Sequence, residues 1–246
     1  MKQPLRTLVL ALCCGLAAAC TQRPEHLKLM SYNIRNGIGI DNIQDIGRIA
    51  RVILREAPDL VALQELDSAT LRVDGRYIPG ELGRMTGMHA TFGRAIGFAG
   101  GSYGVGLLSR TEPLAVRSTP LPGREEARVL LMAEFPDYTV CVTHLSLTPE
   151  DRHASLPLIL QATDTCRKPV LLAGDFNTGD AAAVLAGLGG GFRILSDTTR
   201  MTFPSDNPAV RIDYILGRGL PTSATVTESA VDHTATASDH CPLWVT

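Results

Sequence analysis

Polar residues that can bind a metal ion or move a proton follow several of the hydrophobic runs in this sequence. The set combines carboxylates, amides and imidazoles from distant parts of the chain: Asn33, Glu65, His144, Asp175, Asn177, Asp213, Asp239 and His240. Oxygen-rich groups of this kind suit Mg²⁺ or Mn²⁺, and an imidazole can exchange a proton near neutral pH. The sequence lacks the His-Glu-x-x-His pattern of catalytic zinc sites. These residue types therefore indicate proton or phosphate chemistry assisted by a hard divalent cation.

Each of these residues also has an ordinary structural interpretation when it is taken alone. An asparagine after a strand is often a turn former, which would account for Asn33. Glu65 could be a surface residue, and His144 could be a hydrogen-bonded core histidine. Asp213 is harder to explain in this way, because it lies inside an apolar run and a buried carboxylate needs a partner. Only the joint pattern therefore indicates a function.

Strands and helices must bring these side chains together. Alternating and short apolar runs predict strands at 27–33, 59–64, 105–109, 129–135, 139–145, 169–173, 212–216, 223–229 and 243–245. Helical spacing predicts helices at 43–53, 77–87, 149–165 and 181–188, the first with Asp41 or Asn42 as its N-cap. Most candidate residues fall at strand ends, which are rigid platforms for a site, and Asp213 falls inside a strand. The fold class is therefore α/β, with layered sheets and flanking helices.

Seven short motifs occur in order along the chain. They are Ser31-Tyr32-Asn33, Gln64-Glu65, Tyr103-Gly104, Thr143-His144-Leu145, Gly174-Asp175-Phe176-Asn177, Ile212-Asp213-Tyr214 and Ser238-Asp239-His240. Their order and spacing resemble the endonuclease/exonuclease/phosphatase superfamily, which contains DNase I-like nucleases, inositol polyphosphate 5-phosphatases and neutral sphingomyelinases. The resemblance extends from about Leu29 to residue 246. It implies a four-layered α/β sandwich of the DNase I-like kind: two packed mixed β-sheets flanked by helices, with the active site at one end.

The resemblance also implies a metal site and a catalytic group. Glu65 would be the main ligand of Mg²⁺ (or Mn²⁺), with Asn33 and Asp239 nearby. His240 would be the catalytic imidazole, and Asp213 would orient it. The implied reaction is metal-dependent hydrolysis of a phosphoester, of the phosphodiesterase or endonuclease-like type.

The remaining residues of the implied site would surround the phosphate. Asp175 and Asn177 would position the attacking water and the phosphoryl oxygens. His144 and Tyr103 would bind the scissile phosphate. Arg128 lies where exported relatives often carry a basic residue before a strand, so it would be a further phosphate contact.

The N-terminal segment has the pattern of a targeting signal. Lys2 and Arg6 precede an apolar run and the sequence Leu16-Ala17-Ala18-Ala19-Cys20, which resembles the lipobox of bacterial lipoproteins. We therefore expect residues 1–19 to be a lipoprotein signal peptide, Cys20 to be lipidated, 20–26 to be a tether and 27–246 to be the catalytic domain. The expected location is the bacterial cell envelope, with the membrane as a partner through the lipid anchor. A soluble exported protein that is cut near Ala19 is the alternative.

The charge balance bears on the substrate. The 246 residues carry 23 basic and 25 acidic side chains. Removal of residues 1–19 takes away Lys2 and Arg6 and no acid, which leaves a formal balance of about −4. A tight electrostatic binder of nucleic acid needs a surplus of basic residues. The substrate could be a nucleic acid, a lipid phosphoester or a sugar or inositol phosphate, and a lipoprotein that binds without catalysis is the weakest alternative.

Three cysteines lie outside the N-terminal segment. A disulfide between Cys141 and Cys166 and a state with three reduced thiols are about equally expected, with Cys241 unpaired in both. No CxxC pair occurs, which speaks against a cysteine zinc site. We expect the protein to be a monomer.

Overall fold

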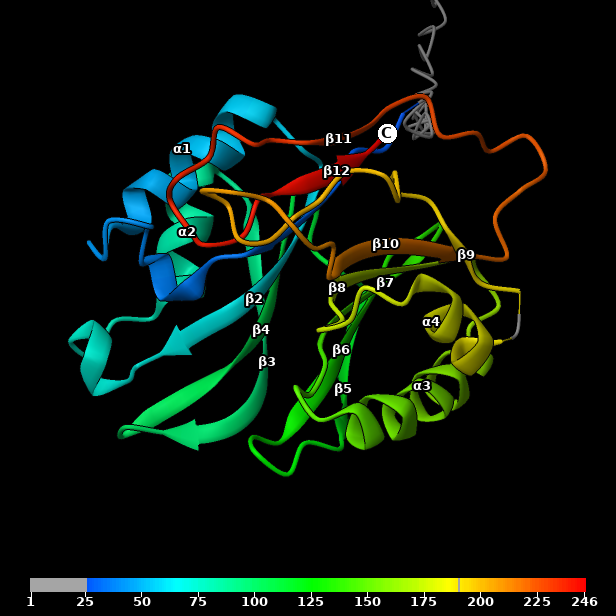
Figure 1. Cartoon of the computed structure of the whole chain (residues 1–246), viewed down its shortest axis with the longest axis horizontal. Helices are drawn as coiled ribbons and strands as arrows, with labels where there is room; N and C mark the ends of the chain where they lie inside the picture. The colour runs from blue at the N-terminus through cyan, green and yellow to red at the C-terminus, as the bar shows by residue number, and fades with distance from the viewer. Residues whose placement is uncertain (1–25, 190) are drawn as a thin grey trace, which may run out of the picture.

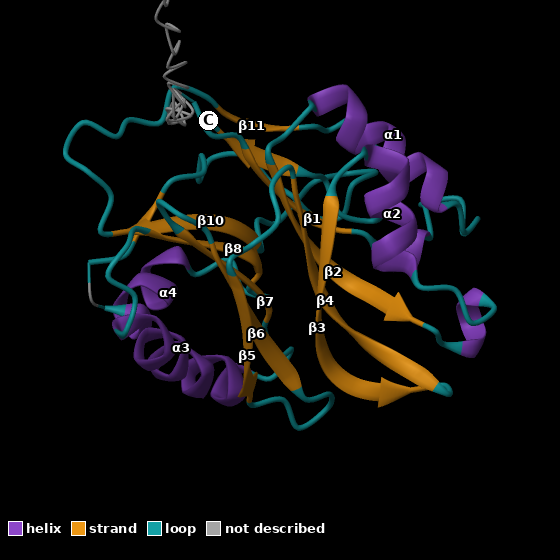
Figure 2. Cartoon of the chain, turned by 180° about the vertical axis from the view of Figure 1, so that it is seen from behind, coloured by secondary structure: helices purple, strands orange, loops and turns teal. Residues whose placement is uncertain are grey.

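Two six-stranded mixed β-sheets lie face to face, with helices on the outer face of each, so the protein has four layers (Figure 1). The computed structural model describes residues 26–189 and 191–246. Figure 2 shows the two sheets from behind, with a pair of long helices outside each one. This is the predicted four-layered α/β sandwich.

The first sheet has the strand order β11-β12-β1-β2-β4-β3. Its strands are β1 (Leu29–Asn33), β2 (Leu60–Ser68), β3 (His89–Phe98), β4 (Gly101–Ser109), β11 (Ser229–Val231) and β12 (Leu243–Val245). β1 pairs in parallel with β2 and antiparallel with β12. The last strand of the described chain therefore lies between β11 and β1, next to the strand with which the described chain begins.

The second sheet has the strand order β5-β6-β7-β8-β10-β9. Its strands are β5 (Ala115–Leu121), β6 (Arg128–Glu134), β7 (Thr139–His144), β8 (Val170–Asp175), β9 (Arg193–Ile194) and β10 (Asp213–Arg218). β7 and β8 are parallel and in register, with His144 opposite Asp175. β10 runs antiparallel to β8, with Asp213 opposite the same Asp175. His144, Asp175 and Asp213 thus lie side by side at one end of these three neighbouring strands.

Alternation along the strands produces three separate apolar layers. Leu29 faces the core between the sheets, while its neighbour Met30 faces the outer core under α1 (Ile46–Glu56) and α2 (Ile78–Thr86). A third core lies between the second sheet and the helices α3 (Pro149–Asp164) and α4 (Ala181–Leu188). Because both sheets are covered on both faces, their inner strands are buried almost throughout, while the edge strands β3 and β5 are largely exposed.

Most of the predicted elements are present, with three corrections. The N-cap of α1 is Asp45, whose side chain accepts from the backbone N–H of Gly47, and not Asp41 or Asn42. Residues 223–228 form no strand, and only Ser229 of the predicted 223–229 strand lies in one, at the start of β11. Strands β3, β5 and the two-residue β9 have no counterpart in the prediction, because many of their residues are exposed and lack a clear alternation.

Two further predictions concern cysteines and the N-terminus. Cys141, Cys166 and Cys241 are free thiols, so the predicted Cys141–Cys166 disulfide is wrong and the alternative of reduced thiols holds. The predicted signal peptide and Cys20 lie outside the described residues. In the part that the structure describes, we find no helix with the length and apolarity to span a membrane.

Candidate active site

The side chain of Asn33 lies at the centre of the polar group that the two sheets bring together. Its amide nitrogen Nδ2 is 3.0 Å from Oε1 of Glu65, 3.1 Å from Oδ2 of Asp175 and 3.4 Å from Nε2 of His240. Asn33 is the last residue of β1 and is fully buried. One amide therefore connects an acid of the first sheet, an acid of the second sheet and an imidazole from the segment before β12.

Asp213 holds the His240 ring through its Nδ1 atom. Its Nδ1 lies 3.0 Å from Oδ2 of Asp213, and the ring packs on Phe203 at a centroid distance of 4.8 Å. Burial lowers the pKa of His240, but the negative charge of Asp213 outweighs this and, with Asp175 and Asp239, raises the pKa to about 10. At neutral pH the ring therefore carries a proton on each nitrogen, and the Asp213 contact at Nδ1 turns Nε2 toward Asn33 and Asp175. Asp213 is the first residue of β10, at its end and not inside the strand as predicted.

Asp175 lies between the two imidazoles of the site. Its Oδ2 is 3.5 Å from Nε2 of His144 and 3.7 Å from Nε2 of His240, while Oδ1 accepts from the backbone N–H of Asn177. Burial lowers the pKa of His144 to about 4, against the opposing effect of Asp175, so His144 is neutral at neutral pH. Asn177 has a left-handed backbone (φ 51°) and donates from Nδ2 to the carbonyl oxygen of Leu145. The Gly-Asp-Phe-Asn turn thus ties the end of β8 to the end of β7.

Glu65 lies in a bulge and not at a strand end, which corrects the prediction. β2 runs on to Ser68, and the pairing of β2 with β4 shifts between Leu63 and Leu66. Glu65 has φ 59°, in the left-handed region that non-glycine residues rarely adopt. Bulges of this kind redirect a side chain, and here the carboxylate reaches Asn33. The sequence shows no sign of the bulge, because the apolar run simply stops at Gln64.

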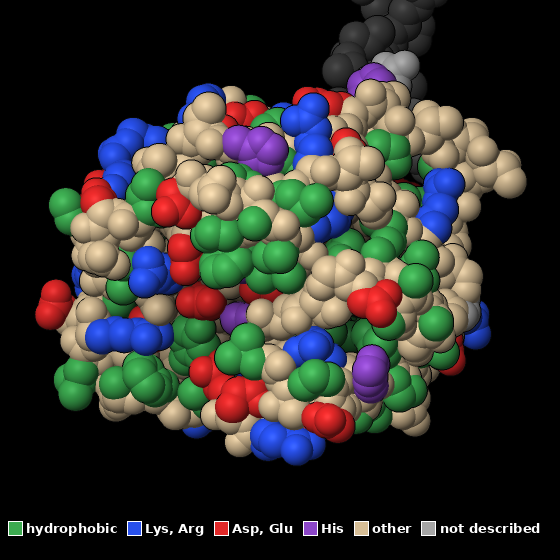
Figure 3. All heavy atoms as spheres, viewed as in Figure 1, with side chains coloured by type: hydrophobic (Ala, Val, Ile, Leu, Met, Phe, Trp, Pro, Cys, Tyr) green, Lys and Arg blue, Asp and Glu red, His purple; other side chains and the backbone are tan. Residues whose placement is uncertain are grey.

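The charges around Glu65 favour a cation. Burial raises the pKa of the Glu65 carboxyl, the Asn33 hydrogen bond lowers it, and the negative charges of Asp239 and Asp175 raise it again. Asp239 itself is 3.4 Å from Nε of Arg35 and is partly exposed. Acidic side chains also lie beside a recessed imidazole near the middle of the face that Figure 3 presents. A divalent cation between Glu65 and Asp239 would relieve this repulsion.

The described residues offer two candidate donor groups for a metal. Ligand atoms of Asp175, Asp213 and His240 lie within 4.8 Å of one another. In that group, however, Asp213 Oδ2 and His240 Nδ1 already satisfy each other. Glu65 and Asp239 offer carboxylate oxygens of the kind that Mg²⁺ prefers. Nδ2 of Asn33 faces Glu65 while Oδ1 accepts from the backbone N–H of Arg35, so the amide would have to turn its oxygen toward Glu65 to become a ligand.

A small hollow beside His144 contains two more of the predicted residues. Tyr103 and Arg128 line it together with His144 and Glu126. Burial raises the pKa of the Tyr103 phenol, so this group stays protonated and can donate a hydrogen bond. The Arg128 guanidinium is buried, and its Nε has no hydrogen-bond partner among the described residues. The ten residues predicted for the catalytic, metal and phosphate sites therefore all lie at one end of the sandwich.

Glu125 is an organising residue that the sequence did not reveal. Its carboxylate accepts from Oγ of Ser146 at 2.7 and 2.9 Å, from the backbone N–H of Leu147 at 2.7 Å and from Nη2 of Arg128 at 3.2 Å. Burial acts to raise the pKa of Glu125, but these hydrogen bonds dominate and lower it to about 2. Glu125 thus fixes Arg128 relative to the loop that follows His144. No motif marks it, because acidic pairs such as Glu125-Glu126 are common on surfaces.

Replacement of Glu125 by glutamine should destabilise the protein in a pH-dependent manner. A carboxyl whose pKa is lower in the folded state stabilises the fold above its unfolded pKa of about 4.5, and this stabilisation is lost as the pH falls through about 2. We expect E125Q to lose on the order of 1–2 kcal/mol at pH 7, because the carboxylate is partly open to solvent. The difference from wild type should shrink toward pH 3 in urea denaturation curves. E112Q removes an exposed acid and serves as the control; an equal loss at both pH values would contradict this explanation.

Similarity to other proteins agrees with this architecture. Two packed sheets with a histidine–aspartate pair and a carboxylate cluster at one end define a phosphoester hydrolase of the layered α/β class. The sequence model described as "Endonuclease/Exonuclease/phosphatase family" matches residues 30–240. The chain belongs to this family.

Solved structures of low sequence identity share the fold. An endonuclease/exonuclease/phosphatase from Beutenbergia cavernae is 24% identical with a TM-score of 0.72, and the match covers 89% of this chain and 70% of that one. A mannosyl-6-phosphatase from Bacteroides thetaiotaomicron is 18% identical with a TM-score of 0.68, over 90% and 99% of the chains. D. rerio TDP2, complexed with a single-strand DNA product, is 23% identical with a TM-score of 0.64, over 89% and 97%.

Proposed function

We propose that this protein hydrolyses phosphoesters with Mg²⁺ or Mn²⁺ as its cofactor, as a phosphodiesterase of the bacterial cell envelope. The observation that carries the proposal is the convergence of Glu65, Asp175 and His240 on the Asn33 amide. A site of this kind combines a cation-binding carboxylate with groups that can move a proton. The relatives of known substrate include a phosphatase and a DNA-bound protein, which supports phosphoester chemistry without fixing the substrate.

The residues have distinct roles in this proposal. Glu65 and Asp239 would hold the cation, which would supply charge neutralisation for the phosphoryl oxygens and the leaving oxygen. Arg128 and Tyr103 donate hydrogen bonds to the phosphate from one side, and neutral His144 donates or accepts beside them. Asn177, held by Leu145, positions a further phosphoryl oxygen.

Water attacks the phosphorus in line with the leaving alcohol. A new P–O bond forms, the ester P–O bond breaks, and the leaving oxygen takes up a proton. The carboxylate of Asp175 can accept the proton of the attacking water. Nε2 of His240, 3.7 Å from it, would accept that proton only where a bound cation offsets the raised pKa of the imidazole, and otherwise donates its own proton to the leaving oxygen. Asp213 keeps the proton of His240 on Nδ1, so that Nε2 faces the reaction.

An activity panel on the domain 27–246 tests this function. Bis-p-nitrophenyl phosphate, p-nitrophenyl phosphate, plasmid DNA, sphingomyelin and inositol phosphates are offered with Mg²⁺, Mn²⁺ or Ca²⁺, and EDTA is the blank. We expect metal-dependent release of nitrophenol from the diester. Folded protein that hydrolyses none of these with any of the three ions would instead support a binding lipoprotein.

The envelope location has its own test. The lipobox-like sequence before Cys20 supports an acyl anchor. We expect the full chain to sediment with membranes after expression in a bacterium, and the Cys20→Ser variant to leave the membrane fraction. If both proteins stayed in the same fraction, the anchor proposal would be wrong, while the hydrolase proposal would be unaffected.

A further inference from the structure

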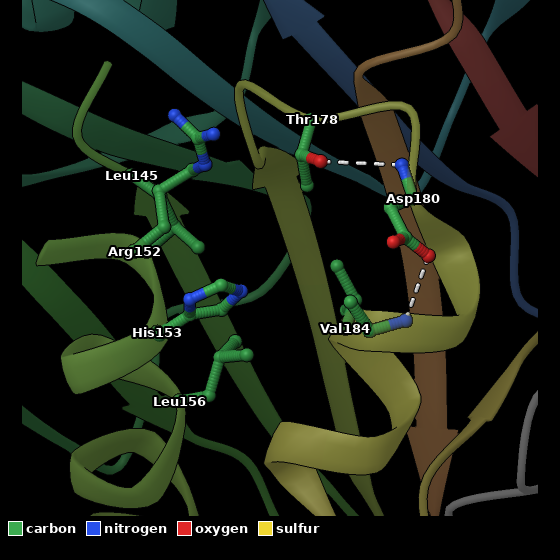
Figure 4. A pocket seen from close by; sticks show the side chains of 8 residues that line it. Leu145, Arg152, His153, Leu156, Thr178, Asp180 and Val184 are labelled. Atoms are coloured by element: carbon green, nitrogen blue, oxygen red, sulfur yellow. Dashed lines mark hydrogen bonds between the residues drawn. The ribbon is translucent and has the colours of Figure 1, made fainter. Parts of the chain in front are cut away.

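The small hollow beside His144 and a larger cavity of about 200 Å³ lie on opposite faces of the second sheet. Leu145, Leu156 and Val184 line the cavity, which opens between α3 and α4, and they belong to the core under these helices (Figure 4). Alternation along β7 turns His144 to the other face, together with Val142. The hollow is therefore on the side of the catalytic centre, and the sheet separates it from the cavity.

The hollow has room for one group of the size of a water molecule. Its volume is about 10 Å³, close to the smallest space that holds a water, so a single phosphoryl oxygen can enter it. Two of its lining side chains carry charge at neutral pH, the Arg128 guanidinium and the Glu126 carboxylate. Burial raises the pKa of Tyr103 and lowers that of His144, so both of these groups are neutral. The charges in the wall of the hollow therefore sum to zero.

Arg128 is held between two carboxylates. Its Nη1 donates to Oε1 of Glu126 at 3.0 Å, and its Nη2 donates to Oε1 of Glu125 at 3.2 Å. A guanidinium has five N–H donors, and these two bonds use two of them. Arg128 can therefore still donate to a phosphoryl oxygen, while two acids already balance its positive charge.

The two acids beside Arg128 have different surroundings. Glu125 also accepts from Oγ of Ser146 and from the backbone N–H of Leu147, so the loop after His144 depends on it. For the Glu126 carboxylate we find Arg128 as the one hydrogen-bond donor among the described residues. Its backbone is closely packed, since a Cβ on Gly123 would clash with the carbonyl oxygen of Glu126. Glu126 is therefore fixed in place, and its charge acts on a group that enters the hollow.

A second cation near the hollow is paired as well. Nε of Arg72 lies 2.5 Å from Oδ2 of Asp67, which is fully buried. The Arg72 guanidinium lies over the rings of Phe98 and Tyr103, 4.6 and 5.1 Å from their centroids. These contacts hold the Tyr103 ring in position. Because Asp67 balances its charge, Arg72 adds no net positive charge to this side of the hollow.

Phosphodiesters and phosphomonoesters differ in charge at neutral pH. A diester carries one negative charge, whereas a monoester carries about −1.5 to −2, because its second pKa is about 6. A carboxylate beside a phosphoryl oxygen repels the monoester more strongly, since the repulsion grows with the charge. A hollow that offers hydrogen-bond donors without a net positive charge therefore favours the diester.

We propose that Glu126 is a specificity-determining residue whose negative charge makes the hollow select phosphodiesters against phosphomonoesters. This inference rests on the proposed hydrolase function and narrows its substrate class to esters with a single negative charge. Arg128 and Tyr103 donate to one phosphoryl oxygen of the diester, and Glu126 repels the additional charge of a monoester. The selectivity comes from a repulsive group as well as from attractive ones.

The kinetic test removes the charge of Glu126 and keeps its shape. Glu126→Gln retains an oxygen that can accept from Arg128. Glu134→Gln is the matched control, because Glu134 ends the same strand β6 and is paired with Lys168 in a similar way. Initial rates are measured with p-nitrophenyl phosphate and bis-p-nitrophenyl phosphate at about pH 8, where the monoester is a dianion.

We expect E126Q to raise the ratio of kcat/KM for the monoester to kcat/KM for the diester by about tenfold or more, and E134Q to leave this ratio within about twofold. A purely structural role of Glu126 would lower both values together and leave their ratio unchanged. An unchanged or lower ratio in E126Q would overturn the inference.

A binding measurement separates this inference from the hydrolase proposal. Phenyl phosphate and methyl phenyl phosphate, which differ by one methyl group and in charge, are titrated calorimetrically in Mg²⁺ against the His240→Ala variant with and without E126Q. We expect E126Q to tighten the binding of phenyl phosphate about fivefold or more relative to methyl phenyl phosphate, even if no ester is hydrolysed. Equal changes for the two ligands, or no measurable binding of phenyl phosphate to the E126Q protein, would contradict the role of Glu126.

Discussion

His240→Ala is expected to lower kcat on a hydrolysed phosphoester by about 10²–10⁴-fold, the usual contribution of a positioned acid or base. The imidazole is the group whose Nε2 faces both Asn33 and Asp175, at 3.4 and 3.7 Å. His144 cannot replace it, because His144 lies on the other side of Asp175. KM should change much less than kcat, since the phosphate contacts of Arg128 and Tyr103 remain.

Removal of His240 also leaves Asp213 buried without its partner, so stability must be measured alongside activity. Loss of a charged hydrogen bond of this kind costs on the order of 1–3 kcal/mol. His240→Asn, which keeps an amide near Asp213, separates the two effects: it should recover part of the stability and none of the rate. His89→Ala changes an exposed histidine at the start of β3 and is the control. A near-wild-type kcat in folded H240A would show that the site is assigned wrongly.

Glu65→Gln should abolish the response to the metal while keeping the fold. Glutamine retains an oxygen that can accept from Asn33 Nδ2, but it removes the charge that a cation needs. A bound cation supplies several kcal/mol of charge stabilisation in the transition state, so kcat/KM with Mg²⁺ should fall more than about 100-fold.

Thermal unfolding with and without Mg²⁺ is a second test of the same variant. A ligand at about 100 times its Kd stabilises the folded protein by about 2.7 kcal/mol. Mg²⁺ should therefore raise the Tm of the wild type and not that of E65Q. In EDTA, E65Q should be at least as stable as the wild type, because the repulsion of Glu65 by Asp239 and Asp175 is gone. E112Q should respond to Mg²⁺ as the wild type does. An Mg²⁺-dependent rise in Tm that survives in E65Q would place the cation elsewhere, for instance at Asp175, Asp213 and His240.

The layered fold could be predicted from the sequence because its buried elements have simple patterns. Continuous apolar runs such as 169–173 predict strands that are covered on both faces, and helix α4 has the predicted bounds. Strands β3 and β5 could not be predicted, since tertiary pairing at the sheet edges holds them and not their own alternation. The absence of a strand at 223–228 has the opposite cause: its residues alternate, but no neighbouring strand pairs with them.

The members of the site could be predicted from motifs, but not the way in which they meet. Nothing in the sequence indicates that Asn33 is the shared partner of three groups, because this depends on how the sheets pack. The bulge at Glu65 and the loop anchored by Glu125 are also consequences of contacts between distant segments. The cavity between α3 and α4 depends on the spacing of two helices, which no local pattern encodes.

The order of the strands has a consequence for biosynthesis. Asp239 and His240 belong to the segment that leads into β12, which completes the first sheet against β1 only after the entire second sheet has been made. Until β12 has been made, the nascent chain has an unpaired edge at β1 and lacks the imidazole, so it can have neither a complete first sheet nor an assembled site.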